Sequence, residues 1–334
     1  MNPAPELSIV IVNWNTRELL LKLLARLFDQ PTMPFEAIVI DNLSGDDSVA
    51  AARAAFPQAR VLPQDENGGF AFGVNRGLEA ARGHWVLLLN TDAEADWQAL
   101  TQFVHEAEQH PKAAVFGPRI VDEHDQTQRS TWRRHLPRHY LPEALFLDRI
   151  FGNNQRANDR DDEGDVDCVS GCVFLIRRNV FDDVQGFDER FFMYYEEADF
   201  CGRVRAAGHS VRYLPSTSFV HVGGLSAAQS AEKTFLAYRE SNLLYHAPWH
   251  GRMWTEYVRL CLVLAHVVRL GIWLAMWPLG RRGKRSKLGL YTAALKQLLR
   301  PGYVGELCRR PRQTPAIASG TADTPCGADS QTHA

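Results

Sequence analysis

The sequence lacks several patterns that would assign it quickly to a class of protein. Its six cysteines include no CxxC pair of the kind that binds zinc, so buried free thiols are expected. Neither GxGxxG nor GxxxxGK[ST] occurs, which leaves a dinucleotide or P-loop site without support. The first apolar run has no basic flank and is too short for a secretory or membrane-spanning segment. We therefore expect the chain to stay in the cytoplasm.

The chain also has little net charge, but the average hides an asymmetry. The formal net charge is −2, yet residues 252–300 contain ten Lys and Arg against one Glu, a net of +9. The remainder carries 27 basic against 38 acidic residues, a net of −11. A basic segment can meet nucleic acid, anionic lipid or water. Here the apolar residues between the charges form a wide, continuous face, which disfavours nucleic acid.

What the chain does contain is a regular alternation of strands and helices. With 334 residues, 45% of them hydrophobic, it can bury one large core. Apolar strand-like runs and helical stretches follow one another at residues 7–12, 16–28, 37–40, 48–56, 60–62, 69–83 and 85–89. This order is typical of βαβ units and predicts a Rossmann-like α/β fold with a mostly parallel central sheet.

Polar residues stand where these strands end. Asn13 and Asp41 follow the first two strands, and the apolar run of Trp85–Leu89 stops at Asn90-Thr91-Asp92. Ligands of open α/β sheets lie beyond the carboxyl ends of the strands, so Asp41 is a candidate ribose or base contact and the triplet a candidate metal and phosphate site. The same residues are also common caps and turn formers. The glycines after Asn67 open a helix, where backbone N–H groups can approach phosphate.

The middle of the chain adds two further features. Residues 121–167 are polar and predict a mobile loop or lid on the acceptor side. An apolar strand then follows at Cys168–Ile176, interrupted by Ser170-Gly171, where the missing side chain could admit a ligand.

Carboxylates and a histidine complete the set of candidate groups. Aromatic residues precede Glu196 and Glu197, and an apolar wall of this kind can raise a carboxyl pKa toward that of a general base. Acids in the first turn of a helix offer a purely structural alternative. His221 stands before two glycines and is either a ligand or a structural histidine.

Taken in order, these motifs resemble a known family. The succession IVIVNWN, VIDNLSGDDS, NGGFAFGVNRG, LLLNTD, VSGCVFLIRR, GFDERFFMYYEEADFCGRVRAAGH and HVGGLS resembles the inverting family-two glycosyltransferases, closest to the rhamnosyltransferase-like members. The resemblance covers roughly residues 7–240. It implies the GT-A nucleotide-diphospho-sugar transferase fold and a catalytic domain over residues 1–240.

The resemblance also implies a role for each matching position. The resemblance implies that the nucleotide-sugar donor is bound by Asn13, Asp41, Asn67, Gly68, Gly69, Asn75, Asn90 and Asp92. Asn90-Thr91-Asp92 stands at the family's DxD motif, so Asp92, His221 and, less directly, Asn90 are expected to hold Mg²⁺ or Mn²⁺. Glu197 stands at the catalytic base, with Glu196 as the alternative. Ser170, Gly171 and Tyr195 are expected to line the sugar and acceptor pocket.

The carboxyl-terminal part predicts a second kind of structure. Arg252, Arg259 and His266 recur every seven residues along an otherwise apolar helix at residues 252–279. We expect this amphipathic helix to lie in the plane of a membrane, with Arg281–Lys287 toward anionic headgroups. A helical hairpin packed on the catalytic domain or on a dimer partner is the alternative. Residues 241–308 are thus a membrane-association or oligomerisation region, and 309–334 a disordered tail.

Together these features predict an inverting transferase. The first candidate reaction moves rhamnose from dTDP-rhamnose to a hydroxyl of a glycan or polyprenyl-lipid-linked acceptor in cell-surface polysaccharide synthesis. The protein is expected at the cytoplasmic face of the inner membrane, as a peripheral protein. A homo-oligomer is an open alternative, and no nucleic-acid partner is expected. UDP-N-acetylglucosamine or UDP-galactofuranose as donor, or a catalytically silent nucleotide-sugar-binding scaffold, are the alternatives.

Overall fold

The first half of the chain forms the predicted alternation of strands and helices. The computed structural model describes residues 5–147, 162–223, 231–275 and 284–314. Its elements up to the fourth strand are β1 Leu7–Asn13, α1 Arg17–Leu27, β2 Phe35–Asp41, α2 Ser48–Ala55, β3 Arg60–Pro63, α3 Phe70–Ala80 and β4 Trp85–Leu89. The α/β fold expected from the sequence is confirmed.

The second half adds shorter strands and then helices. It contains β5 Ala93–Glu94, α4 Trp97–Glu108, β6 Ala113–Val121, β7 Thr127–Gln128, β8 Thr131–Trp132, η1 Pro137–His139, α5 Tyr140–Ala144, β9 Gly164–Asp165, β10 Cys168–Val169, β11 Val173–Arg177, α7 Val180–Val184, α8 Glu196–Ala206, β12 Ser210–His221, α10 Ala231–Ala275, α11 Lys284–Leu298 and α12 Tyr303–Arg309.

One large sheet organises these elements. Its strand order is β3-β2-β1-β4-β11-β6-β12-β5, with β7 on β6 and β9 on β12. Strands β1 to β4 pair in parallel, and β12 is parallel to β6, whereas β11 runs antiparallel between β4 and β6. The sheet is therefore mixed but mostly parallel, and β4 lies near its centre.

Each face of the sheet is covered by its own hydrophobic core. Along β4, Trp85, Leu87 and Leu89 belong to the core that α1, α2 and α4 cover, while Val86 and Leu88 belong to the core under α3, α7 and α8. All five side chains are at most 2% exposed. Because both faces are buried, the strand must be apolar throughout, which is why its sequence shows no alternation.

Two predictions about the middle of the chain need correction. The apolar stretch at residues 168–176 is two strands: β10 pairs with β8 in a separate two-stranded sheet, and β11 joins the main sheet. Ser170-Gly171 forms the turn between them. The polar stretch at residues 121–167 contains β7, β8, η1, α5 and β9, so its described part is built into the fold; residues 148–161 lie outside the described ranges.

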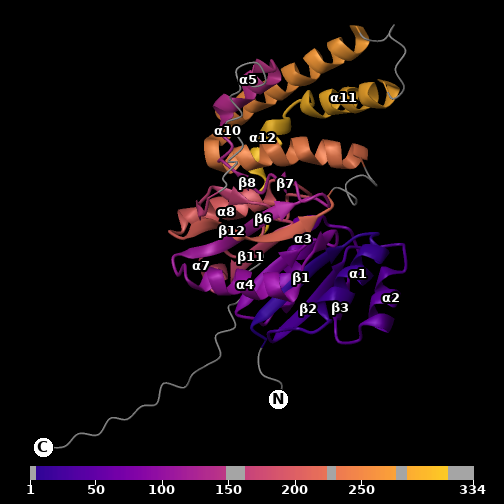
Figure 1. The fold of residues 1–334 in the computed structure, drawn as a ribbon. Coiled ribbons are helices and arrows are strands. Elements are labelled where there is room, and N and C mark those ends of the chain that lie inside the picture. The colour runs from indigo at the N-terminus through magenta and orange to yellow at the C-terminus, as the bar shows by residue number, and fades with distance from the viewer. Residues whose placement is uncertain (1–4, 148–161, 224–230, 276–283, 315–334) are drawn as a thin grey trace, which may run out of the picture.

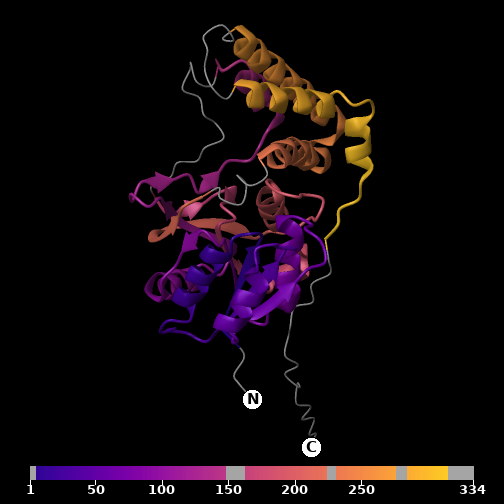
Figure 2. The same ribbon diagram turned by 90° about the vertical axis from the view of Figure 1, so that its right-hand side faces the viewer.

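A layer of helices lies over one side of the sheet domain (Figures 1 and 2). It consists of α10, α11 and α12, with α5 beside α10. Helix α10 is two helices joined at a kink, because Gly251 has φ 77° and ψ 172° and Pro248 lies just before it. The helix predicted from Arg252 onward is the second of these two; residues 276–279 fall outside the described ranges.

The end of the described chain returns to the catalytic domain, which corrects part of the predicted disordered tail. Arg309 ends α12, and residues 310–314 run along the buried Asp188 and Asp199. The Gln313 carbonyl accepts from the Glu189 amide at 2.8 Å, and Arg312 donates to Asp199 Oδ1 at 3.0 Å. Residues 315–334 lie outside the described ranges. We call residues 310–314 the return segment.

The return segment should stabilise the protein through Arg312. Asp199 is fully buried and lies in α8, so Arg312→Ala leaves one of its oxygens with fewer donors and should lower the free energy of unfolding by about 1–2 kcal/mol. Urea unfolding followed by circular dichroism measures this change. The control is Arg300→Ala, whose ion pair with Glu306 is about half exposed and should matter by less than about 0.5 kcal/mol. Equal stability of the two variants would contradict the assigned role.

Candidate functional site

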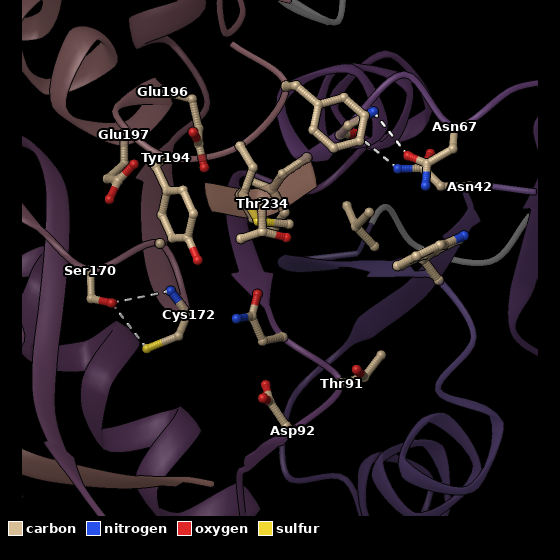
Figure 3. A pocket seen from close by; sticks show the side chains of 18 of the residues that line it. Asn42, Asn67, Thr91, Asp92, Ser170, Cys172, Tyr194, Glu196, Glu197 and Thr234 are labelled. Carbon is tan, nitrogen blue, oxygen red and sulfur yellow. Dashed lines mark hydrogen bonds between the residues drawn. The ribbon is translucent and has the colours of Figure 1, made fainter. Parts of the chain in front are cut away.

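A cavity of about 310 Å³ lies at the carboxyl ends of β1, β2 and β4, bounded on the far side by α8 and by the start of α10. Its lining comes from separate segments between residues 12 and 234 and comprises Val12, Trp14, Asn42, Asn67, Gly69, Phe70, Asn90, Thr91, Asp92, Ser170, Gly171, Cys172, Phe192, Met193, Tyr194, Glu196, Glu197, His221, Lys233 and Thr234. In Figure 3, Glu196 and Glu197 lie at one side of this pocket, Asp92 at another, and Asn42 with Asn67 at a third.

Asp92 and His221 meet although 129 positions separate them. His221 ends β12, which pairs antiparallel with β5 so that His221 lies opposite Ala93, and the Val222 amide donates to the Asp92 carbonyl at 3.0 Å. This register places His221 Nε2 3.3 Å from Asp92 Oδ1. The Nε2 atom is buried and has no hydrogen-bond partner among the described residues. A buried ring nitrogen beside a carboxylate and open to a cavity is a suitable pair of metal ligands.

Hydrogen bonds to two neighbouring segments hold the other two residues of the triplet, Asn90 and Thr91. Thr91 Oγ1 lies 3.0 Å from Thr16 Oγ1, and Thr16 donates to Asn13 Oδ1 at 2.8 Å. The Asn90 amide donates to the Cys172 carbonyl at 3.0 Å, and the Asn90 side chain lines the pocket. The backbone around Asp92 is thus fixed from two sides. Within the described ranges no three His, Cys, Asp or Glu side chains cluster as a complete metal site.

Asn13 and Asp41 face each other instead of the pocket. Asn13 Nδ2 donates to Asp41 Oδ2 at 2.7 Å, and Asp41 Oδ1 accepts from the Ser44 amide at 2.9 Å. Both are at most 2% exposed, and neither lines the cavity. The next residue, Asn42, lines the pocket, and the Asn13–Asp41 pair lies behind it. The predicted donor contacts of Asn13 and Asp41 stay predictions.

The glycines after Asn67 serve close packing. Gly69 has φ +94°, and a Cβ there would come within 2.2 Å of the Phe192 carbonyl oxygen. The Phe70 amide donates to that same oxygen at 2.8 Å, and the Gly69 amide donates to Asn67 Oδ1 at 3.1 Å. These two N–H groups are therefore already bonded within the protein. Gly68 lies outside the lining, and a Cβ on it would meet the Phe72 ring at 2.5 Å.

Glu196, which is buried, and Glu197, which is partly buried, form an acid pair at the start of α8. Each has an Oε2 atom that is buried and has no hydrogen-bond partner among the described residues. Burial raises the pKa of Glu197 to about 7. Burial and the neighbouring Glu197 raise the pKa of Glu196 well above its usual range. A carboxyl whose pKa lies near 7 can exchange its proton at neutral pH, which favours Glu197 as a general base.

The turn before this pair is strained. Tyr194 and Tyr195 have φ values of 70° and 68°, in the left-handed region that residues with side chains seldom adopt. As a result they point in different directions. Tyr194 lines the pocket, whereas the Tyr195 hydroxyl accepts from Asn242 Nδ2 at 2.6 Å in the helical layer. In this structure Tyr194, and not the predicted Tyr195, is the tyrosine that lines the cavity.

Three more predicted positions, Ser170, Gly171 and Asn75, differ in whether they line the cavity. Ser170 and Gly171 line the pocket as expected, and the Glu197 Cβ lies 4.0 Å from where a Cβ on Gly171 would be. Asn75 lies outside the lining and is fully buried, because its side chain donates to the Phe187 carbonyl at 2.9 Å and accepts from the Phe187 amide at 2.8 Å. Its role is to join α3 to the segment before α8.

Several lining residues were not identified from the sequence. Trp14 and Phe192 lie inside quoted motifs and could have been found as aromatics next to strand and helix ends. Lys233 and Thr234 carry no such signal, since they belong to the first turn of a helix that covers the pocket only in the folded chain. The Lys233 ammonium lies 4.0 Å from the centre of the Phe192 ring, which places a positive charge at the pocket.

The fold and the pocket together define a class of enzyme. An open, mostly parallel sheet carries an acid–histidine pair at the end of its central strand, and an acid pair with raised pKa values faces the same cavity. This arrangement is that of a GT-A glycosyltransferase. The chain matches glycosyl transferase family 2 over residues 8–185, more than half of its length, and belongs to that family.

Individual relatives agree with this assignment. The chain is 28% identical over 302 residues to the N-acetylglucosaminyl-diphospho-decaprenol L-rhamnosyltransferase of Mycobacterium tuberculosis, covering 85% of this chain and 97% of the relative.

Among solved structures, the fold resembles the mannosyltransferase PcManGT of Pyrobaculum calidifontis in complex with GDP-Man and Mn²⁺, with TM-score 0.53 and 14% identity over 90% of this chain and 88% of that one. It also resembles GalNAc-T7 with UDP, GalNAc and Mn²⁺, with TM-score 0.52 and 15% identity over 74% and 51% of the two chains. The GT-A fold predicted from the sequence is confirmed.

Proposed function

We propose that this glycosyltransferase moves a sugar, with inversion, from a nucleoside diphosphate to a hydroxyl group of a polyprenyl-diphosphate-linked glycan in cell-surface polysaccharide synthesis. Rhamnose from dTDP-rhamnose is the first candidate donor. The observation that carries the proposal is the pocket itself, where Glu196 and Glu197 face one side and Asp92 with His221 face another. The donor and acceptor classes are supported by the rhamnosyltransferase relative, which shares nearly its whole length with this chain.

The nucleotide is proposed to bind on the β1–β2 side of the pocket. Trp14 and Val12 offer an apolar surface for a base, and Asn42 and Asn67 offer amide groups beside it. Asn42 is itself fixed, because its Nδ2 donates to the Gly69 carbonyl at 2.8 Å. Asn13 and Asp41 hold this wall in place from behind. The site is thus largely preformed, which reduces the ordering cost of binding.

Asp92 and His221 would hold Mg²⁺ or Mn²⁺, and Asn90 lies beside them in the lining. The unbonded His221 Nε2 fits this role. A bound divalent cation would neutralise the negative charge that develops on the departing diphosphate. Two protein ligands agree with how such ions are often held, by one or two side chains together with substrate phosphates. The residues present therefore fit a cation that binds chiefly together with the nucleotide.

Glu197 is proposed as the general base. Departure of the diphosphate makes the sugar oxocarbenium-like, so the acceptor hydroxyl must attack from the opposite face while its proton is removed. Glu197 Oε2 has no competing hydrogen bond among the described residues, and its pKa near 7 suits proton removal at neutral pH. The neighbouring Glu196 has its pKa raised by burial and by Glu197, so its neutral form is favoured and can donate a hydrogen bond. The Tyr194 ring and Ser170 lie beside the pair in Figure 3 and are proposed to shape the acceptor pocket.

The proposal is tested by a panel of nucleotide-sugars assayed for release of nucleoside diphosphate, with Mn²⁺ present. Release should be fastest with dTDP-rhamnose and should depend on an acceptor such as polyprenyl-diphospho-N-acetylglucosamine. Faster release from UDP-N-acetylglucosamine or UDP-galactofuranose would overturn the choice of rhamnose. No release from any donor, with thermal stabilisation by a nucleotide-sugar retained, would overturn the reaction and leave a silent binding protein.

The acid pair predicts a specific pH profile. The rate should rise with pH through about 7, because Glu197 acts only when deprotonated. Glu197→Gln should keep donor affinity but lose roughly 10²-fold or more in turnover, whereas Glu196→Gln should keep most of it. Near-normal turnover of Glu197→Gln, with loss in Glu196→Gln, would assign the base to Glu196 instead.

The same pair affects stability with a definite sign. Because the folded pKa of Glu197 is raised, this carboxyl favours folding below its unfolded pKa of about 4.3, and its contribution is lost as pH rises through about 7. Thermal unfolding of Glu197→Gln should therefore depend less on pH across this window than that of the wild type.

The proposed metal site predicts coupled binding of cation and nucleotide. In calorimetry, Mn²⁺ should bind weakly to the protein alone and more tightly when dTDP is present. Asp92→Asn and His221→Ala should each weaken Mn²⁺ binding in the presence of dTDP by roughly 10- to 100-fold. Asp125→Asn and His105→Ala, at exposed positions away from the pocket, should leave it unchanged. Unaltered binding in both pocket variants would rule out this site.

A further inference from the structure

Exposed apolar side chains gather in one region of the molecule. Eleven large hydrophobic residues of the described chain are exposed, and only Leu43 and Leu299 stand apart from the group. The other nine are Leu141, Leu145 and Leu147 at α5 and Met253, Trp254, Leu260, Val267, Ile272 and Leu274 on the second half of α10. Helix α5 packs against α10, so the two sets belong to neighbouring elements (Figure 1). We call these nine residues the apolar face.

On α10 the apolar face is a stripe along one side. Met253, Leu260, Val267 and Leu274 recur every seven residues and are 75%, 57%, 50% and 55% exposed. A seven-residue spacing drifts by only about 20° per repeat around a straight helix, so these side chains share one side of it. The charged residues between Met253 and Leu274 are all partly covered. By length and composition alone α10 could cross a membrane, since its most apolar 18-residue window has mean hydropathy 1.8 and is 22% buried.

The polar residues of this helix face the protein. Arg259 donates to the Leu298 carbonyl of α11 at 2.9 Å and to Glu256 at 2.7 Å. His266 is 3% exposed and accepts from Arg239 at 3.1 Å, within the first half of α10. A helix on the surface of a water-soluble protein has the opposite arrangement, with its apolar side inward. The stripe of Arg252, Arg259 and His266 predicted from the sequence therefore marks mostly the packed side.

These inward contacts decide how the helix can meet a bilayer. A spanning α10 would have to leave the Leu298 carbonyl and Arg239, and would carry Arg259 and Arg269 into hydrocarbon at a large cost. A helix that keeps these contacts can bury only its outer side. It therefore lies in the plane of the surface, with its apolar side in the acyl region and the rest of the protein in water.

Charge distinguishes a membrane from a second copy of the chain. The nine-residue face lies in or beside the segment of residues 252–300 with its net charge of +9, and Lys287 is exposed with its ammonium 5.1 Å from the centre of the Trp273 ring. A symmetric dimer through this face would bring two such basic segments together, where like charges oppose association. Anionic lipid headgroups attract the same charge.

We propose that the apolar face docks into the surface of a membrane that contains anionic lipids, with the second half of α10 parallel to the bilayer. The proposal deepens the proposed function and rests on its lipid-linked acceptor. Helix α10 begins at the pocket, where Lys233 and Thr234 line the cavity, and continues into the docking face. The two halves of α10 thus connect the membrane surface to the site, so the sugar end of a polyprenyl-diphosphate can reach Glu197 while its chain stays in the bilayer.

The test is flotation of the full-length protein with vesicles. Wild type should float with phosphatidylcholine–phosphatidylglycerol vesicles and much less with phosphatidylcholine alone. The double variant Leu260→Glu/Val267→Glu should bind the mixed vesicles at least roughly tenfold more weakly. Leu43→Glu is the matched control, since Leu43 is as exposed as Leu260 at 57% but lies outside the apolar face. Its binding should equal that of the wild type.

Two further measurements keep this proposal separate from the proposed function. Transfer to a short water-soluble acceptor should be the same in the wild type and in Leu260→Glu/Val267→Glu, because both positions are exposed and away from the pocket. Vesicle binding without any sugar transfer would contradict the proposed transferase function but would still support membrane docking. Absence of vesicle binding by the wild type, a dimer that the double variant abolishes, or resistance to alkaline carbonate extraction would each overturn in-plane docking.

Discussion

The pocket depends on one close approach of two backbone segments. The Phe192 carbonyl accepts the Phe70 amide at 2.8 Å, and only a residue without a side chain fits at Gly69, where a Cβ would lie 2.2 Å from that carbonyl oxygen. The contact joins the start of α3, beside the proposed nucleotide wall, to the strained turn that carries Tyr194 and leads into Glu196 and Glu197. Both walls of the cavity are positioned by it, and the buried Asn75 clamp on Phe187 supports the same junction from behind.

Some of the buried polar atoms that lack a hydrogen-bond partner in the described chain lie around the pocket. His221 Nε2, Glu196 Oε2 and Glu197 Oε2 are buried and unbonded among the described residues, and all three side chains line one cavity. Buried polar atoms are normally satisfied, because an unsatisfied one costs about 1–3 kcal/mol. A protein that keeps three such atoms around a single pocket forgoes stability where a substrate, a proton and a cation can supply the missing interactions. The raised pKa values of the two glutamates follow from this same lack of solvation.

The helical layer follows a different physical rule. Polar side chains such as Arg259 and His266 hold the second half of α10 to α11 and to its own first half, while a stripe of apolar side chains on the other side is exposed. The return segment completes this layer, since Arg312 and Gln313 bond to Asp199 and Asp188 beside the catalytic helix. The helices are therefore attached to the sheet domain through the return segment and through Trp249 of α10, which donates to Asp199 of α8.

The sequence by itself determined the order of strands and helices, the mostly parallel sheet, the family and the motifs that reach the pocket, because these depend on local apolar patterns and on polar residues at strand ends. Tertiary structure decided which residue of each motif faces the cavity. Asn42 lines the cavity while Asp41 bonds to Asn13 behind it. Tyr194 lines the cavity while Tyr195 does not, and both have left-handed backbone conformations. Only the fold brought Lys233 and Thr234 to the site. Likewise, sequence identified the amphipathic α10, but packing against α11 decided that its polar side is the buried one.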